Sequence, residues 1–293
     1  MFDTPILFLI FNRPDLAQIV FNQIKKIQPK YLYVAADGPR ANKVGENILC
    51  EKTRAIIKQV DWNCEVKTLF REQNLGCGIA VSNAITWFFN NVEQGIILED
   101  DCLPQLTFFN FCESLLNYYK TDNNVMAISG FNAQLGISRT KHSYFFANIP
   151  LVWGWATWSH AWKKFEFDID IIDENVFNND TKMAWKKEII DTYNGKMDSW
   201  AFKWIYNFLK NNFICVYPNV SLVRNIGIGE NSTHTDGERW WYKHIKYGEI
   251  FAIQHPPKIT INYKADRLTT NVHHNILLTL EDRIKRLFIR NNK

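Results

Sequence analysis

The sequence lacks the motifs that mark several large classes of protein. Its six cysteines include no C-x-x-C pair and have no regular spacing, so they indicate neither a disulfide framework nor a zinc site. We therefore expect reduced thiols and a cytoplasmic protein; a secreted protein with unpaired thiols is the alternative. No apolar run approaches the ~18 residues of a membrane span. The first apolar run, PILFLIF, follows the acidic Asp3 and lacks the positively charged n-region and the cleavage site of a signal peptide.

The charge balance is too small to indicate a nucleic-acid-binding protein. The 34 basic and 30 acidic side chains leave a formal net charge of +4, so we expect no nucleic-acid partner. Apolar material is plentiful, because 46% of the 293 residues are hydrophobic and 15% are aromatic. This is enough for one large core, and in the absence of an internal repeat or a low-complexity linker we expect a single continuous body.

The first part of the chain alternates between apolar runs and helical patterns. Four runs, at 5–11, 31–36, 64–70 and 95–98, predict strands, and the segments between them repeat apolar residues at helical spacing. Successive strand-then-helix units are typical of an α/β fold with a mostly parallel sheet and helices on both faces. In such a sheet, ligands bind at the carboxyl ends of the strands.

Polar side chains follow each of the four predicted strands. In chain order they are Asn12, Arg13, Asp37, Arg71, Asn74, Glu99, Asp100 and Asp101. The last three are consecutive carboxylates that repel one another and therefore require a cation, and hard oxygen ligands suit Mg²⁺ or Mn²⁺. We interpret this edge of the sheet as a metal and diphosphate site; the alternative is a solvated turn after a strand.

Two phosphate-binding motifs are absent from the expected places. The chain has no G-x-x-x-x-G-K-[ST], which excludes a P-loop, and no G-x-G-x-x-G directly after the first predicted strand, which excludes a dinucleotide fingerprint. What remains is an α/β sheet that holds a nucleotide with a metal at an acidic strand end. Nucleotide-sugar enzymes have this arrangement.

The second part of the chain breaks the alternation. One further strand is predicted at 125–132, followed by tryptophan-rich segments with helical patterns at 181–194, 198–211, 236–249 and 275–291. The last of these has a basic face around an apolar stripe. It predicts peripheral contact with an anionic membrane surface; a helix packed on the domain with its basic face in water is the alternative.

Seven short motifs then occur in order along most of the chain: FNRP, AADGP, ILEDD, AISGFN, PLVWGWATW, MDSW and YPNVSLVRNIG. Together they resemble the GT-A nucleotide-diphospho-sugar transferases, and among these the N-acetylglucosaminyltransferase I family and its bacterial relatives. The resemblance implies a GT-A fold. In it, residues 1–130 form the nucleotide-sugar-binding, Rossmann-like half, and residues 131–293 form the acceptor-binding half with the catalytic base.

The resemblance also implies roles for single residues. Asp101 is expected to ligate Mn²⁺ or Mg²⁺ at the donor diphosphate, while Glu99 and Asp100 contact the ribose, the sugar or metal-bound water. Arg13 and Asp37 match positions that contact the nucleotide base. Asp37 would accept from the uracil N3–H, which favours a UDP-sugar.

Four residues of the second half have expected roles as well. Asp198 matches the general base, although Asp is also a common N-cap and the helical pattern begins directly after it. His234 falls in a loop that closes over the donor in the family; a loop histidine without such a role is the alternative. Trp153 and Trp155 flank a glycine and would line the sugar or acceptor site with their indole faces, whereas most large aromatic side chains serve as core.

The expected activity is the metal-dependent transfer of a sugar, GlcNAc or another hexose, from a UDP-sugar. The acceptor would be a hydroxyl of a glycan or lipid-linked glycan in bacterial surface polysaccharide or lipo-oligosaccharide synthesis, with inversion at the anomeric carbon. One alternative is a sugar-phosphate nucleotidyltransferase, which needs a glycine-rich, basic signature where this chain has Asn12-Arg13-Pro14. The other is a non-catalytic glycan-binding protein with the same fold.

Overall fold

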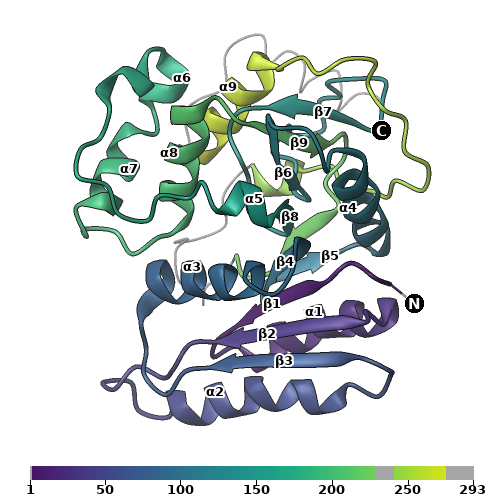
Figure 1. The fold of residues 1–293 in the computed structure, drawn as a ribbon, viewed down its shortest axis with the longest axis vertical. Helices are drawn as coiled ribbons and strands as arrows, with labels where there is room; N and C mark the ends of the chain where they lie inside the picture. Colours follow the sequence, from purple (N-terminus) through teal and green to yellow (C-terminus); the bar gives the residue numbers. More distant parts are fainter. Residues whose placement is uncertain (1, 229–240, 275–293) are drawn as a thin grey trace.

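The computed structural model describes residues 2–228 and 241–274, and these form an eight-stranded sheet with helices on both faces (Figure 1). The strands of this sheet are β1 Ile6–Ile10, β2 Tyr31–Ala36, β3 Glu65–Phe70, β4 Gln94–Glu99, β6 Val125–Ser129, β7 Tyr144–Ala147, β8 Trp155–Trp158 and β9 Ile214–Pro218. A second, two-stranded sheet consists of β5 Cys102–Pro104 and β10 Val223–Asn225. The helices are α1 Pro14–Ile27, α2 Glu46–Ala55, α3 Gly76–Phe89, α4 Leu106–Tyr118, α5 Ser159–Trp162, α6 Asp180–Met183, α7 Lys186–Tyr193, α8 Ala201–Asn211 and α9 Tyr263–His273.

The strand order of the large sheet is β3-β2-β1-β4-β8-β6-β9-β7. The pairs among β1, β2, β3 and β4 are parallel, as is the pair of β6 with β9. Strands β7 and β8 run in the opposite direction and make the antiparallel pairs. The expected α/β, Rossmann-like class with a mostly parallel sheet is therefore confirmed. Strands from both sides of residue 130 lie in this one sheet, while the functional division of the chain into two halves stays a prediction.

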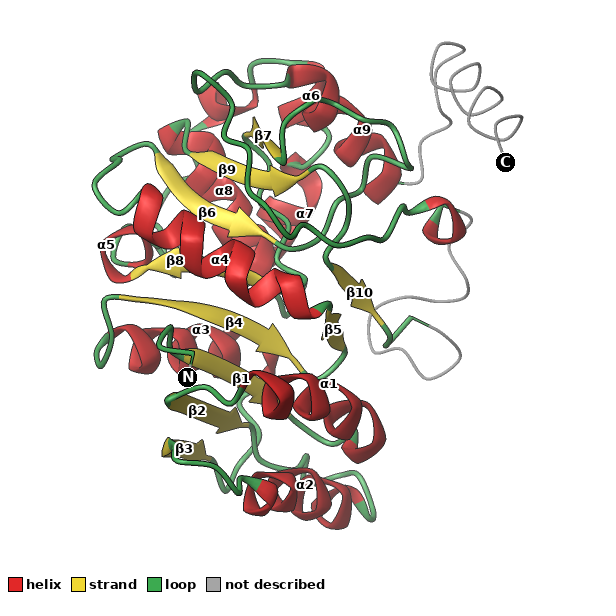
Figure 2. Ribbon diagram, turned by 90° about the vertical axis from the view of Figure 1, so that its right-hand side faces the viewer, coloured by secondary structure: helices red, strands yellow, loops and turns green. Residues whose placement is uncertain are grey.

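The chain reverses its direction across the sheet after β3. From β1 it steps outward through β2 to β3 and then returns to place β4 on the other side of β1. Because crossover connections are right-handed, the reversal puts α3 on the face opposite to α1 and α2, as Figure 2 shows. Ligands of open α/β sheets bind in the crevice at such a reversal, which here lies at the carboxyl ends of β1 and β4.

The core explains why the first strands could be recognised as continuous apolar runs. All five residues of β1 are buried, because helices cover both faces of the sheet. Around β8 the core is instead built of indole rings, where Trp155 contacts Trp162, Trp200 and Trp204. Burial of such large side chains contributes about 2–3 kcal/mol each relative to exposure.

Several predicted helices differ from the observed ones. The predicted helix at 181–194 is two helices, α6 and α7, and the part of 236–249 that the structure describes holds only the short 3₁₀ turn Tyr242–His244. The helix predicted at 275–291 lies outside the described residues. Helices α4 and α9 and strands β7 and β8 were not predicted. Across the part of the chain that the structure describes, no helix combines the length and the hydropathy needed to cross a bilayer.

Candidate active site

A cleft of about 420 Å³ opens at the carboxyl ends of the parallel strands. Most of the residues that the sequence singled out line it: Arg13, Asp37, Arg71, Asn74, Glu99, Asp100, Asp101, Trp153 and Asp198. They come from the ends of four strands, from the segment before β8 and from the segment between α7 and α8, which are far apart in sequence. The structure thus brings into one cleft side chains that the sequence predicted as separate site residues.

The acidic trio forms one wall of the cleft. Asp100 is only 5% exposed, and one of its oxygens accepts from the backbone N–H of Phe11 at 3.2 Å, which ties the end of β4 to the end of β1. Burial together with the charges of Asp101 and Asp100 raises the pKa of Glu99 to about 8. Burial also raises the pKa of Asp100 to about 7, although the neighbouring Arg13 opposes the shift. The wall therefore holds more negative charge than its surroundings stabilise.

Arg13 is the cation that faces this wall. Its guanidinium donates to Asp101 Oδ2 at 3.1 Å and lies 3.7 Å from Asp100 Oδ1. One guanidinium balances one of the three carboxylates, so the described part of this wall has unbalanced negative charge when all three are ionised. A divalent cation would supply the missing charge, and carboxylate oxygens are suitable ligands for Mg²⁺ or Mn²⁺. In this respect the donor set fits the expected metal.

The trio alone does not form a complete metal cage. Among the residues that the structure describes, no group of three or more His, Cys, Asp or Glu side chains is arranged to hold a metal ion. Mg²⁺ sites commonly use one or two carboxylates, with water and substrate phosphate as the other ligands. A cation at this cleft would accordingly depend on its ligand as well as on the protein.

The N-terminus of α3 is held by two carboxylates from different parts of the chain. Asp37, after β2, accepts from the N–H groups of Leu75 and Gly76 at 3.0 and 3.1 Å. Asp198 accepts from the N–H groups of Cys77 and Gly78 at 2.7 and 2.6 Å. These amides have no partner within the helix, and negative charge is favourable at a helix N-terminus.

This arrangement excludes one of the two interpretations of Asp198, that of an N-cap of the helix that follows it. The N-cap position of α8 is Trp200, which makes no side-chain capping bond, so Asp198 does not cap the helix that follows it. Its carboxylate instead lies on the N-terminus of α3 and lines the cleft. The prediction that Asp198 is a general base stays a prediction, and the geometry gives this residue a structural task in addition.

The glycines of the NLGCG segment make room for Asp198. A Cβ at Gly78 would lie 2.8 Å from Asp198 Oδ1, and one at Gly76 would lie 2.5 Å from Oδ2. Gly76 also has a φ of +82°, which side chains rarely adopt. The glycines are visible in the sequence, but only the fold shows that they admit a carboxylate from more than a hundred residues away.

Arg71 is a cleft arginine without an acidic partner in the described part of the chain. Its backbone N–H and C=O take part in hydrogen bonds, whereas no bond or ion pair of its guanidinium is seen there. Burial lowers the pKa of Arg71, and Asp37 opposes this only in part. By contrast, the nearby Arg40 is paired with the buried carboxylate of Glu46. A half-buried cation without a partner is suited to bind an anionic ligand.

Sequence reasoning gave no individual role to Asn225, Gly227 and Ile228, which also line the cleft. Strand β10 pairs with β5, and the N–H of Ile226 donates to the carbonyl of Asp101 at 2.7 Å. A Cβ at Gly227 would lie 2.3 Å from Asp101 Oδ2, so this glycine allows the backbone to approach the acidic wall. The signal was present in the motif YPNVSLVRNIG, whose last residue is this glycine.

Two of the predicted site residues that the structure describes, Trp155 and Asn12, do not line the cleft. Trp155 is 1% exposed in the central strand β8 and stacks on Trp200, so the prediction that it lines the sugar site is wrong. The side-chain amide of Asn12 donates to Glu46 at 2.9 Å, and Asn12 does not line the cleft. His234 lies outside the described residues. Trp153, on the other side of Gly154, does line the cleft.

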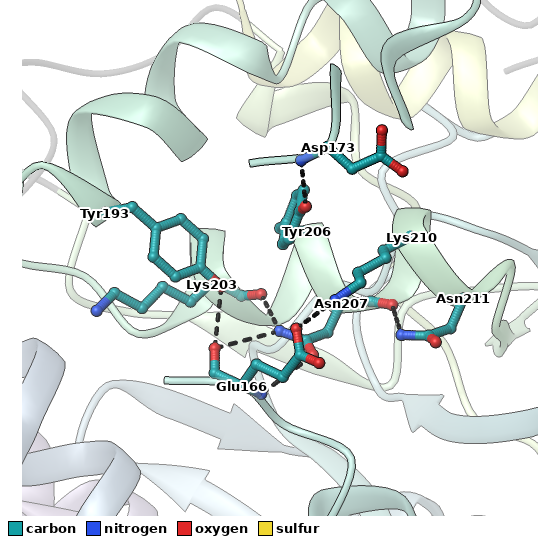
Figure 3. A network of polar contacts seen from close by, with 8 residues as sticks. All are labelled: Glu166, Asp173, Tyr193, Lys203, Tyr206, Asn207, Lys210 and Asn211. Atoms are coloured by element: carbon teal, nitrogen blue, oxygen red, sulfur yellow. Dashed lines mark hydrogen bonds and ion pairs between the residues drawn. The ribbon is translucent and has the colours of Figure 1, made fainter. Parts of the chain in front are cut away.

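A polar network supports the helix that follows Asp198 (Figure 3). Asn207 of α8 accepts from the backbone N–H of Glu166 at 3.1 Å, and Tyr193 of α7 donates its hydroxyl proton to the carbonyl of Glu166 at 2.9 Å. Asn207 is fully buried. Water cannot reach its side-chain amide, so the protein must supply the hydrogen-bond partners. They fix α8 against α7, and α8 begins three residues after Asp198.

Comparisons with known proteins give only distant matches. No protein-family model matches the chain, and neither does any curated protein. Solved structures that match include a cytidylyltransferase from Leptospira borgpetersenii, with 11% identity, a TM-score of 0.37, and coverage of 72% of this chain and 95% of that one. Mouse xyloside xylosyltransferase 1, in its apo form, has 10% identity and a TM-score of 0.36, with 72% and 82% covered. The fold class given above follows from the strand order and pairing of this chain.

Proposed function

We propose that this chain is a glycosyltransferase that moves a sugar from a nucleotide-diphospho-sugar to an acceptor hydroxyl and uses a divalent cation. The observation that carries the proposal is the meeting of the acidic trio, Arg13, Arg71 and Asp198 in one cleft at the reversal of the sheet. Unbalanced carboxylates suit a cation, guanidinium groups suit a diphosphate, and a separate carboxylate suits a proton transfer.

Each group has a stated task in the proposed reaction. Asp101 would hold Mn²⁺ or Mg²⁺, whose chemistry when bound is to neutralise charge on the departing diphosphate. Arg71 binds an anionic part of the donor, and Arg13 holds the acidic wall in place through Asp100 and Asp101. Asp198 accepts the proton of the acceptor hydroxyl at a carboxylate oxygen, because a carboxylate that accepts two N–H bonds still has free lone pairs.

The finer assignment rests on the resemblance of the sequence motifs. It favours UDP as the nucleotide, GlcNAc or another hexose as the sugar, inversion at the anomeric carbon, and kinship with the N-acetylglucosaminyltransferase I family. The acceptor would be a glycan or a lipid-linked glycan of a bacterial surface polysaccharide, reached from the cytoplasm. The position of Asp37 beside the cleft supports the base contact, but its carboxylate also holds the N-terminus of α3.

The connection after β1 weighs against a sugar-phosphate nucleotidyltransferase. Helix α1 begins at Pro14 and β1 ends at Ile10, which leaves three residues, none of them glycine. The nucleotidyltransferase alternative needs a glycine-rich phosphate-binding loop at this place, and these three residues do not supply one. A non-catalytic glycan-binding protein could have the same fold and the same cleft. It would differ from the proposed transferase only in that it transfers no sugar.

One assay separates the three functions. The full chain is incubated with Mn²⁺ and a panel of UDP-, GDP- and dTDP-sugars, and in parallel with nucleoside triphosphates and sugar 1-phosphates. We expect slow release of a nucleoside diphosphate from at least one nucleotide sugar, and none when EDTA replaces Mn²⁺. Pyrophosphate release from the second mixture alone would assign a nucleotidyltransferase, and nucleotide-sugar binding with neither product would assign a non-catalytic protein. Either result contradicts the proposal.

A further inference from the structure

A second hollow, of about 430 Å³, lies between α6, the first turns of α9 and the chain at 148–149. It shares no lining residue with the cleft. Figure 1 shows α6 and α9 at the end of the molecule opposite to β2 and β3. Ile149 and Leu209 give it an apolar base, and polar side chains surround this base. The hollow is therefore separate from the candidate active site.

A buried carboxylate lies at the base of this hollow. Asp266 is 3% exposed. Its Oδ1 accepts from the backbone N–H groups of Asn148 and Ile149 at 2.9 and 3.1 Å, and its Oδ2 accepts from the N–H of Asn148 at 3.1 Å. No ion pair of Asp266 is seen in the described part of the chain, although Lys182 is close enough to interact with its charge. A carboxylate with two oxygens has acceptor capacity beyond these bonds, which a ligand hydroxyl can use.

Cations lie around the rim. Lys264 and Arg267 are one turn apart on α9, and both are exposed and make no ion pair with the other described residues. Lys182 lies across the hollow on α6 and donates to Asn212 at 3.3 Å. The hollow is lined by these three cations and by two carboxylates, Asp180 and Asp266. Its rim therefore has a net positive charge, while the carboxylate of Asp266 at its base can accept hydrogen bonds.

The lining also offers an aromatic surface. Tyr263, the first residue of α9, is 72% exposed and lines the same hollow. A phenol ring presents an apolar face with a polar edge at little cost in conformational entropy. Free phosphate would meet the carboxylates of Asp180 and Asp266 without using this ring. The mixture of exposed ring, acceptor and cations suits a ring-shaped ligand that carries both hydroxyl groups and negative charge.

We propose that this hollow is an accessory binding site for an acidic saccharide, that is, an oligosaccharide with carboxylate groups. Its hydroxyl groups donate to Asp266 and to the amide oxygen of Asn148, one sugar ring lies against Tyr263, and its carboxylates pair with Lys264 and Arg267. The proposal does not depend on the transferase activity, because it uses none of the residues of the cleft.

The test is a calorimetric titration of the full chain with trigalacturonate and, separately, with neutral maltotriose, at low salt. We expect trigalacturonate to bind and maltotriose to bind at least about tenfold more weakly, a difference of about 1.4 kcal/mol. Arg267→Ala, Lys264→Ala and Tyr263→Ala should each weaken trigalacturonate binding by about fivefold or more, since each removes a contact worth about 1 kcal/mol. All three residues are exposed, so these variants should fold.

Two controls make the result specific to the hollow. Lys58→Ala removes an exposed cation elsewhere on the surface, and Asp101→Asn alters the cleft; both should bind trigalacturonate like the unchanged chain. The proposal is overturned if trigalacturonate does not bind, if maltotriose binds equally well, or if the three α9 variants bind normally. Loss of binding in Asp101→Asn alone would place the saccharide in the cleft and would also overturn it.

Discussion

Asp266 is a buried acid whose titration affects the stability of the fold. Burial raises its pKa to about 6, against the effect of two backbone N–H bonds. The folded state then binds a proton more tightly than the unfolded state, in which the pKa is about 3.9. The stabilisation that the proton provides is complete below the unfolded pKa and is lost as the pH rises through about 6.

We therefore predict that Asp266→Asn changes the pH dependence of folding. Between about pH 4 and pH 6, the free energy of unfolding of the unchanged chain should fall relative to that of the variant by up to about 3 kcal/mol, because one pKa unit corresponds to 1.36 kcal/mol. Urea denaturation at a series of pH values measures the difference. Two parallel curves would show that Asp266 titrates normally, and Glu72→Gln, which changes an exposed carboxylate, serves as control.

The candidate site could be predicted residue by residue wherever a side chain follows a strand directly. Arg13, Asp37, Arg71 and the acidic trio are of this kind, since parallel strands deliver their ends to one edge. Trp155 could not be placed correctly, because an indole beside a glycine suits a loop and a buried strand equally well. Which tryptophan enters the cleft depends on Gly154, whose φ of +65° turns the chain between Trp153 and β8.

The N-terminus of helix α3 is stabilised by two carboxylates, Asp37 and Asp198, which accept from its first N–H groups. Glycine in a helix interior costs about 1 kcal/mol relative to alanine, so Gly78→Ala would stabilise an isolated helix. In this fold the new Cβ would lie 2.8 Å from Asp198 Oδ1. The substitution must displace either the carboxylate or the helix, and the two charged hydrogen bonds would weaken.

We predict that the sign of the Gly78→Ala effect depends on Asp198. In the unchanged chain Gly78→Ala should lower the free energy of unfolding by about 1–2 kcal/mol. In the Asp198→Ala background, where the obstructing oxygen is gone, the same change should raise it by up to about 1 kcal/mol. Thermal and urea unfolding of the four proteins measures the coupling. Equal effects in both backgrounds would mean that Asp198 is not held on α3.

Elements of the first half were predictable, and several of the second half were not, for a physical reason. Strands buried on both faces read as continuous apolar runs, and their connecting helices show one apolar face. Strands β7 and β8 are four residues long, too short for a period to appear. Helix α9 contains Asp266 and three threonines or asparagines among its buried or half-buried residues, so it lacks the apolar stripe that marks a surface helix.

At the scale of the whole molecule, the proposed site is made by two distant parts of the chain. The sheet reversal brings the ends of β1 and β4 together, and β10 covers the acidic wall from the far end of the sequence. Asp198 reaches the same cleft from the segment before α8. The mostly parallel sheet was predicted from the alternation of strands and helices, whereas its strand order was not. The approach of β10 and Asp198 is a tertiary contact that no local pattern encodes.

The central claim is that this cleft binds a nucleoside diphosphate together with a divalent cation at Asp101. A calorimetric titration of the full chain with UDP and Mn²⁺ tests it directly, with Asp101→Asn as the variant and Glu72→Gln as the control. We predict binding that weakens by at least about tenfold, about 1.4 kcal/mol, both in EDTA and in Asp101→Asn, while thermal unfolding shows the variant folded and the control binds normally. Equal affinity with and without Mn²⁺, or in folded Asp101→Asn, would contradict the account.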